Sequence, residues 1–159
     1  MDSCKLSLSV QYAVKSPDLR QDLPTRQQFR RWIKAALQQD VHITLRIVDE
    51  SEGRALNKKF RGKNSATNVL TFVEDAAEIL YGDIVICAPV VEQEARAQQK
   101  NLHAHYAHLT IHAALHLQGH DHEHPAEAAK MEALETALLA KLRYADPYCV
   151  VGASKNSKS

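Results

Sequence analysis

The sequence predicts a layered α/β fold of the α+β kind, in which a small, mainly four-stranded mixed sheet is covered by about five helices. Two observations lead to this prediction. The first half of the chain alternates strand-like and helix-like segments, whereas the second half has an almost entirely helical pattern. Most of the nine histidines fall in the second half, so we expect a metal site at the central C-terminal helix.

The predicted strands lie in the first half of the chain. Residues 5–14 alternate polar and apolar side chains with the period of two that is typical of a half-buried strand, and residues 41–48 repeat the pattern. Residues 67–73 and 81–87 are rich in β-branched and apolar side chains and flank an acidic segment, so we expect them to pair with each other.

Apolar positions at helical spacing predict the helices. Residues 17–24 are interpreted as an irregular connection, after which Thr25 is a suitable N-cap for a helix that carries Phe29 and Trp32 on its apolar face. The other helices are predicted at residues 51–60, 89–99, 103–118 and 125–142. The apolar stripe of the last helix consists of Met131, Leu134, Leu138 and Leu142. We expect these helices to cover one face of the sheet.

Composition indicates a single ordinary domain. The chain has 159 residues, of which 45% are hydrophobic and 25% charged, and we assign residues 1–150 to the domain. Residues 151–159 are mostly small and polar, so we predict a disordered tail there. The net charge of +1 excludes a polycation that coats nucleic acid, so any nucleic-acid binding must be local.

The sequence favours a cytoplasmic protein. No window approaches the ~20 apolar residues that a membrane span needs, and the first residues lack the pattern of a secretory leader. The three cysteines, Cys4, Cys87 and Cys149, are far apart and match no zinc or redox spacing. We therefore interpret them as structural thiols in a reducing compartment and expect no membrane partner.

The segment HLTIHAALHLQGHDHEH, residues 108–124, has the spacing of a metal site. His112 and His116 are four apart on a predicted helix, so both imidazoles reach one ion. Gly119 suits the left-handed residue that ends a helix, and the returning chain brings His122 to the same ion. This H-x-x-x-H-x-x-G-x-x-H spacing is that of the three-histidine zinc site in metzincin proteases. We predict that these histidines bind one Zn²⁺ per chain, although another transition metal such as Ni²⁺ also suits them.

The neighbouring histidines compete with this assignment. His103 and His105 are interpreted as solvated side chains, whereas His108 remains open between a lining role and contact with a ligand. His120 and His124 flank the third predicted ligand and are also interpreted as solvated side chains. A catalytic zinc needs three protein ligands and an open position, so a fourth histidine ligand would indicate a structural site.

The residue after the first predicted ligand bears on the reaction. Metalloproteases place a glutamate there to deprotonate the zinc-bound water, and this chain has Ala113. Proteolysis is therefore disfavoured. Hydrolysis of a phosphodiester remains compatible with the site if a cation is present to bind the phosphate.

The candidate cation lies in the basic segment KKFRGKNSATNVLTF, residues 58–72. Its lysines are interpreted as solvated charges that strengthen binding modestly. Arg61 stands beside Gly62 at the start of a turn, where its planar fork of donors is suited to hold a phosphate bidentately. We predict Arg61 to be the catalytic residue that stabilises the charge on the phosphate.

Together these segments resemble the YbeY family, bacterial metal-dependent endoribonucleases. The resemblance covers nearly the whole chain and includes YGDIVIC at residues 81–87, MEALE at residues 131–135 and DPY at residues 146–148. The chain departs from the family where Ala113 replaces a usual glycine and His120 a usual tyrosine, and at Asn68 and Val73. None of these positions is a predicted ligand.

The resemblance implies a small α/β fold, a metal held by the three motif histidines, and Arg61 as the key arginine. It also implies a hydrolase of single-stranded RNA that acts in ribosome biogenesis, in maturation of the 16S rRNA 3′ end and in ribosome quality control. Ribosomal RNA and the ribosome or ribosomal proteins would be its partners, and the oligomeric state stays open.

Two other functions compete with the nuclease. One is a non-catalytic ribosome-assembly factor with a structural zinc, which a fourth ligand from His108, His120 or His124 would favour. The other is a zinc peptidase, which Ala113 makes the weakest hypothesis.

Overall fold

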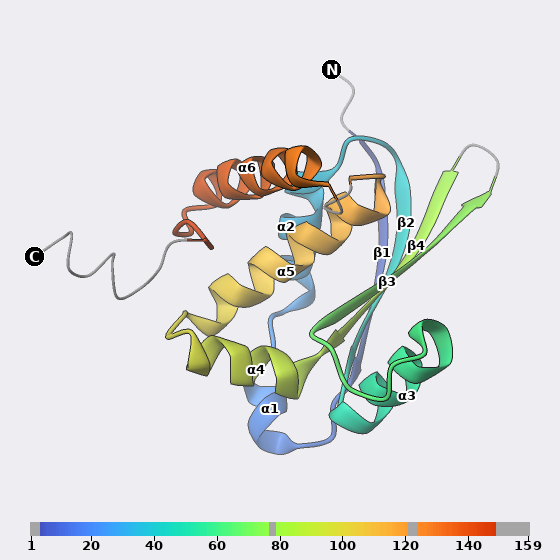
Figure 1. Cartoon of the computed structure of the whole chain (residues 1–159), viewed down its shortest axis with the longest axis vertical. Helices are drawn as coiled ribbons and strands as arrows, with labels where there is room; N and C mark the ends of the chain where they lie inside the picture. Colours follow the sequence, from blue (N-terminus) through green and yellow to red (C-terminus); the bar gives the residue numbers. More distant parts are fainter. Residues whose placement is uncertain (1–3, 77–78, 121–123, 149–159) are drawn as a thin grey trace, which may run out of the picture.

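The computed structural model in Figure 1 describes residues 4–76, 79–120 and 124–148. Its strands are β1 (Leu6–Ala13), β2 (Val41–Val48), β3 (Val69–Ala76) and β4 (Ile79–Cys87), and they form one four-stranded sheet in the order β1-β2-β4-β3. The first, second and fourth strands are parallel, whereas β3 runs antiparallel to β4. The predicted mixed sheet, including the pairing of its last two strands, is confirmed.

The described residues form six helices, one more than expected. They are α1 (Pro17–Gln21), α2 (Arg26–Ala36), α3 (Glu50–Arg61), α4 (Ala88–Ala97), α5 (Leu102–Leu117) and α6 (Pro125–Lys141). The additional helix is α1, where the prediction of an irregular connection was wrong. Pro17 occupies its first turn together with Asp18, and both residues favour a helix start. None of the described helices combines the length and apolar character that crossing a bilayer requires.

The main core lies between the sheet and the helices α2 and α5. Alternate residues of β2 and β4 point into it and meet aromatic and aliphatic side chains of the two helices. The fully buried members include Leu45, Ile47, Ile84, Ile86, Phe29, Trp32, Ile111 and Leu115. Each such side chain contributes about 1.5–3 kcal/mol to folding when it leaves water, so this layer holds α5 firmly against the sheet.

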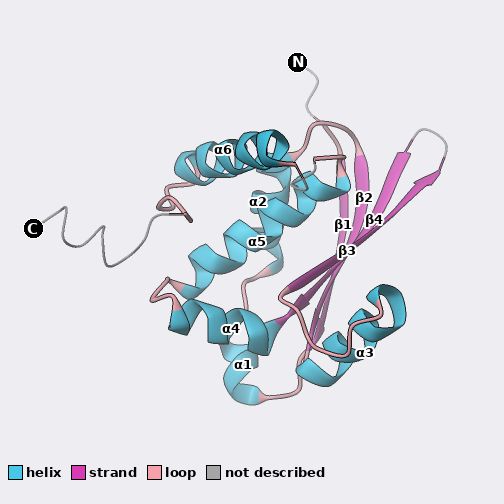
Figure 2. Cartoon of the chain, in the orientation of Figure 1, coloured by secondary structure: helices cyan, strands magenta, loops and turns pink. Residues whose placement is uncertain are grey.

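The prediction that helices cover only one face of the sheet was wrong. Figures 1 and 2 show α3 on the opposite side of the sheet from α2, α5 and α6. The strand ends carry apolar side chains on this second face as well, among them Val48, Val85 and Cys87, which form a smaller cluster with Leu56 of α3. Gly53 lets α3 approach closely, because a Cβ there would lie 3.0 Å from Sγ of Cys87.

Helix α5 ends as the sequence predicts. Gly119 adopts a left-handed φ of 102°, and the amides of Gly119 and His120 return to the carbonyls of His116 and Leu115, which is the Schellman arrangement of a helix C-terminus. The helix also sits close to the sheet at this end, since a Cβ on Gly82 would lie 2.7 Å from Cδ1 of Leu117. The local sequence thus brings the end of α5 against β4.

A capping box at the start of α2 gives a test of the fold. The hydroxyl of Thr25 accepts from the amide of Gln28 at 3.1 Å, and the side-chain oxygen of Gln28 accepts from the amide of Thr25 at 2.8 Å. We expect Thr25→Ala to lower the free energy of unfolding by about 1 kcal/mol, measured by urea unfolding. Thr25→Ser keeps the acceptor and should match the wild type. An unchanged midpoint in Thr25→Ala would contradict the role of the cap.

Candidate active site

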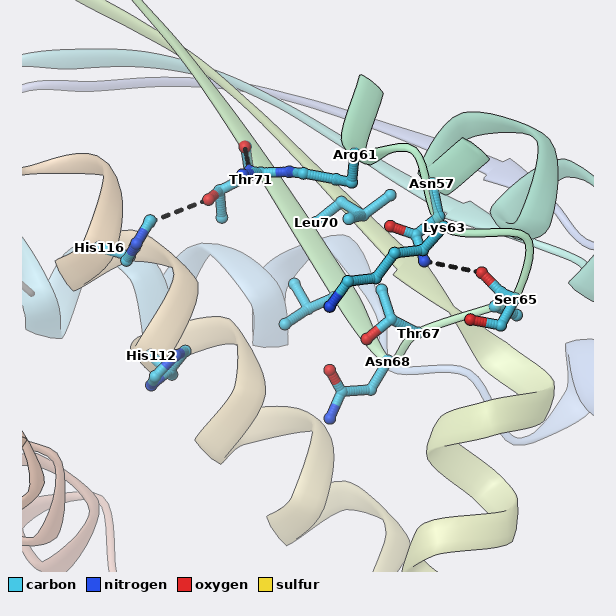
Figure 3. Close-up of a pocket in the computed structure, with 12 residues that line it drawn as sticks. Asn57, Arg61, Lys63, Ser65, Thr67, Asn68, Leu70, Thr71, His112 and His116 are labelled. Carbon is cyan, nitrogen blue, oxygen red and sulfur yellow. Dashed lines mark hydrogen bonds between the residues drawn. The ribbon is translucent and has the colours of Figure 1, made fainter. Parts of the chain in front are cut away.

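A polar cleft of about 740 Å³ lies between α5 and the segment that joins α3 to β3 (Figure 3). Helix α5 contributes His112 and His116 to its wall, and the opposite wall carries Arg61, Lys63 and Asn68. The two segments that the sequence analysis singled out are about fifty residues apart in the chain. The histidines and the basic segment therefore face the same space.

The two imidazoles of α5 stack beside each other. The ring centres of His112 and His116 lie 6.5 Å apart with an angle of 16° between the planes. Nδ1 of His116 is 3.0 Å from Oγ1 of Thr71, a residue of β3. Nδ1 of His112 donates to the Glu135 carboxylate of α6. Since a carboxylate only accepts, neutral His112 carries its proton on Nδ1, and Nε2 carries the lone pair.

Glu135 is the centre of a buried hydrogen-bond network. Its side chain has no exposed surface, and its carboxylate also accepts from the hydroxyl of Tyr148 and from Nε2 of His108, the latter at 3.2 Å. Burial would raise the pKa of Glu135, but the hydrogen bonds from His108, His112 and Tyr148 outweigh it and lower the pKa to about 2. Glu135 is therefore ionised at neutral pH in spite of its burial.

Sequence reasoning missed Glu135. The predicted apolar stripe of α6 turned out half-buried at its three leucines, whereas the deeply buried face consists of Met131, Glu135 and Leu139. The sequence did contain a signal for its burial: Glu135 lies four positions from Met131 and from Leu139, so all three residues share one face of the helix. A charged residue on a helix face that packs against the core needs partners, and here the histidines of α5 supply them.

The prediction that His105 is solvated was wrong. Its side chain is only 5% exposed, and Nε2 donates to Glu94 of α4 at 2.9 Å. Burial lowers the pKa of His105, although the bond to Glu94 opposes this. His105 is buried because its ring lies on the side of α5 that packs against α4. His103 is half-buried, and its Nδ1 lies 3.4 Å from Nε2 of Gln28.

The remaining candidate ligands are only partly described. His122 lies outside the described residues, so its role stays a prediction. His120 bonds to Oε1 of Gln38 at 2.8 Å, and His124 is exposed at the start of α6. Within the described ranges, no cluster of three or more His, Cys, Asp or Glu is placed to hold a metal ion. The structure thus brings together the two helical ligands of the predicted triplet.

Arg61 is the last residue of α3, and its guanidinium reaches over β3. Nη2 donates to the carbonyl of Thr71 at 2.9 Å, and the guanidinium carbon lies 5.8 Å from the ring centre of Phe72. Gly62 ends the helix at a φ of 73°, and Asn57 holds the following turn by donating to the carbonyl of Ser65 at 2.7 Å. The turn therefore positions an exposed cation beside the two imidazoles.

The buried network predicts the effect of Glu135→Gln on stability. An amide has only one acceptor oxygen, so its NH₂ group would face a donor on one side of the network. We expect the free energy of unfolding at pH 7 to fall by about 1–3 kcal/mol, measured by urea unfolding with chelator present. The matched control is Glu132→Gln, an exposed position on the same helix, which should leave stability unchanged.

The same network predicts that the stability of the folded state depends on pH. Folding lowers the pKa of Glu135 from 4.5 to about 2, so the ionised carboxylate stabilises the folded state above pH 4.5 and loses this contribution as the pH falls toward 2. The difference in stability between the wild type and Glu135→Gln should therefore narrow below pH 4.5. A difference that stays constant down to the lowest measurable pH would contradict this assignment.

Comparison with known proteins shows extensive similarity. A family model described as "Endoribonuclease YbeY" matches residues 14–143. The chain is 53% identical over 146 residues to an Endoribonuclease YbeY of Nitrosomonas europaea, covering 92% of this chain and 87% of that protein. It is 54% identical to an Endoribonuclease YbeY of Aromatoleum aromaticum, covering 92% of this chain and 94% of that protein.

A solved structure agrees with these sequence matches. The solution structure of TM1509 from Thermotoga maritima is 26% identical in sequence and superposes with a TM-score of 0.52, covering 88% of this chain and 99% of that one. The family model extends over β2, β3, β4, α5 and the basic segment. The chain belongs to the Endoribonuclease YbeY family.

Proposed function

We propose that this chain is a metal-dependent endoribonuclease that cleaves single-stranded RNA in the cleft between α5 and the basic segment. Membership of the family and the names of its curated relatives support the activity. The observation that carries the proposal for this site is the placement of His112, His116 and Arg61 on the walls of one cleft. A pair of imidazoles that can hold a metal and a cation that can bind a phosphate are suited together to metal-assisted phosphodiester hydrolysis.

The described side chains fit a bound metal ion. His112 and His116 each have Nδ1 in a hydrogen bond, to Glu135 and Thr71 respectively. Proteins commonly hold metal-binding histidines in this way, with a carboxylate or another acceptor on one ring nitrogen and the metal on the other. His112, His116 and His122 would hold one Zn²⁺, or another transition metal such as Ni²⁺. When bound, the ion supplies Lewis acidity and a water of lowered pKa.

The chain's own residues bind and orient the substrate. Arg61 stabilises the charge that develops on the phosphoryl oxygens, because its planar fork offers two parallel donors to a phosphate. Lys63 lines the same cleft and adds to the attraction for the RNA backbone. Ala113 has no exposed surface, so the position that carries the base in metalloproteases offers no acid or base to the cleft. This supports a phosphodiester over a peptide substrate.

The ring nitrogens that bond to protein favour a catalytic over a structural metal. His108 and His120 use Nε2 for Glu135 and Gln38, whereas the two proposed helical ligands use Nδ1. A fourth ligand from His108 or His120 would have to bind through Nδ1, unlike the proposed ligands, so we favour three histidines and the open position of a catalytic metal. The proposed cellular role is cytoplasmic ribosome biogenesis, with maturation of the 16S rRNA 3′ end, ribosome quality control and contact with ribosomal proteins.

Arg61 gives the most specific test of the proposed reaction. We expect Arg61→Ala to keep its fold and metal content while single-turnover cleavage of a single-stranded RNA falls by about 10²-fold or more. Arg61→Lys should bind RNA with similar salt dependence yet cleave slowly, because a point charge lacks the bidentate fork. Lys58→Ala, which removes a charge from the same helix, should weaken binding only modestly. Full activity in Arg61→Ala would contradict the phosphate-binding role.

The histidines are tested by metal content. We expect His116→Ala to lose the metal that the natively purified wild type carries, and to melt at a lower temperature, because the ion links α5 to the chain beyond Gly119. Elemental analysis and thermal melts with and without chelator measure both effects. His124→Ala is the matched control and should retain the metal. Unchanged metal stoichiometry in His116→Ala would show that the ligand assignment is wrong.

A further inference from the structure

A second hollow, of about 390 Å³, adjoins the cleft on the far side of Arg61. Three residues line both spaces, namely Arg61, Thr71 and His116. The remaining lining of the second hollow is apolar and consists of Phe60, Phe72, Val73 and Leu117. The polar cleft therefore continues into an apolar hollow, and the proposed catalytic arginine is one of the three residues at the boundary between them.

The apolar side chains of this hollow are unusually exposed. Phe60 is 52% exposed and Val73 is 56% exposed, although both carry large hydrophobic groups. Phe60 is not loose, because its ring centre lies 5.0 Å from that of Phe72 at an angle of 59°. Phe72 in turn packs against the smaller core cluster beneath α3. Phe60 therefore presents an exposed ring, held in place by Phe72, that is suited to contact with a flat apolar group.

Cations border these rings. Nζ of Lys59 lies 5.2 Å from the ring centre of Phe60, and the guanidinium carbon of Arg61 lies 5.8 Å from the ring centre of Phe72. Proteins that bind single-stranded nucleic acid combine aromatic side chains, on which bases stack, with cations that follow the phosphates. A docking site for an apolar protein segment would not need this pairing of each ring with a cation.

We propose that Phe60, supported by Phe72, stacks against the base of the nucleotide next to the phosphate that Arg61 binds. This inference rests on the proposed RNA substrate. Phe60 and Arg61 are consecutive residues, so the base and the phosphate they contact belong to the same short stretch of RNA. A base paired within a duplex is already stacked on its neighbours and is not available to the ring. The site therefore contributes to a preference for single strands and tolerates any base, since every base has a π face.

The test compares protein and RNA changes in a double-mutant cycle. The probe is a single-stranded RNA with one cleavage site, and a second RNA has an abasic residue next to the scissile phosphate. Stacking on one aromatic residue is worth about 1–3 kcal/mol, so Phe60→Ala should raise the Kd for intact RNA about 5- to 160-fold, whereas Phe60→Trp should bind as the wild type does. Tyr81→Ala removes another exposed aromatic ring, 41% exposed, outside both hollows, and should leave Kd unchanged.

The abasic residue distinguishes stacking from a general loss of binding. It should weaken binding to the wild type and have little further effect on Phe60→Ala, because both changes remove the same contact. The inference is overturned if Phe60→Ala binds intact RNA like the wild type, or if the abasic residue weakens both proteins equally. In either case a wild type that still cleaves RNA keeps the proposed function. A wild type that neither binds nor cleaves RNA would overturn both proposals. Thermal melts of each variant verify folding.

Discussion

The buried carboxylate of Glu135 is the interaction on which the site depends. A charge without exposed surface is tolerated only when donors surround it, and here they come from His108 and His112 of α5 and from Tyr148 near the end of the described chain. The network ties α6 and the C-terminal segment to α5. It also determines which nitrogen of His112 carries the proton, so the same contact serves stability and the chemistry of the cleft.

Thr71 connects the two halves of the cleft. Its hydroxyl lies 3.0 Å from Nδ1 of His116, and its carbonyl accepts from Arg61 at 2.9 Å. One residue of β3 therefore positions the imidazole on one wall and the guanidinium on the other (Figure 3). The arrangement relies on the close packing of α5 at Gly82 of β4. Rearrangement of this edge of the sheet would separate the metal side from the phosphate side.

Local sequence patterns predicted what short-range physics determines. The alternation of the strands, the N-cap at Thr25 and the left-handed Gly119 each depend on a few neighbouring residues, and all are confirmed. The missed features depend on packing between distant segments. Glu135 and His105 are buried because other helices cover them, and α3 crosses the second face because strand ends there are apolar. Periodicity within one segment can mark a face that becomes buried, but it does not identify the distant segment that covers it.

The central claim is that the buried Glu135 carboxylate holds the proton of His112 on Nδ1 and so places the lone pair on Nε2, the nitrogen proposed to bind the metal. The most direct measurement is long-range ¹H–¹⁵N NMR of the imidazoles in metal-free protein, which identifies the protonated nitrogen of each ring. With the Glu135 carboxylate as acceptor, neutral His112 should carry its proton on Nδ1, and Glu135→Gln should disturb His112 more than His116. A proton on Nε2 of His112 in the wild type would contradict the claim.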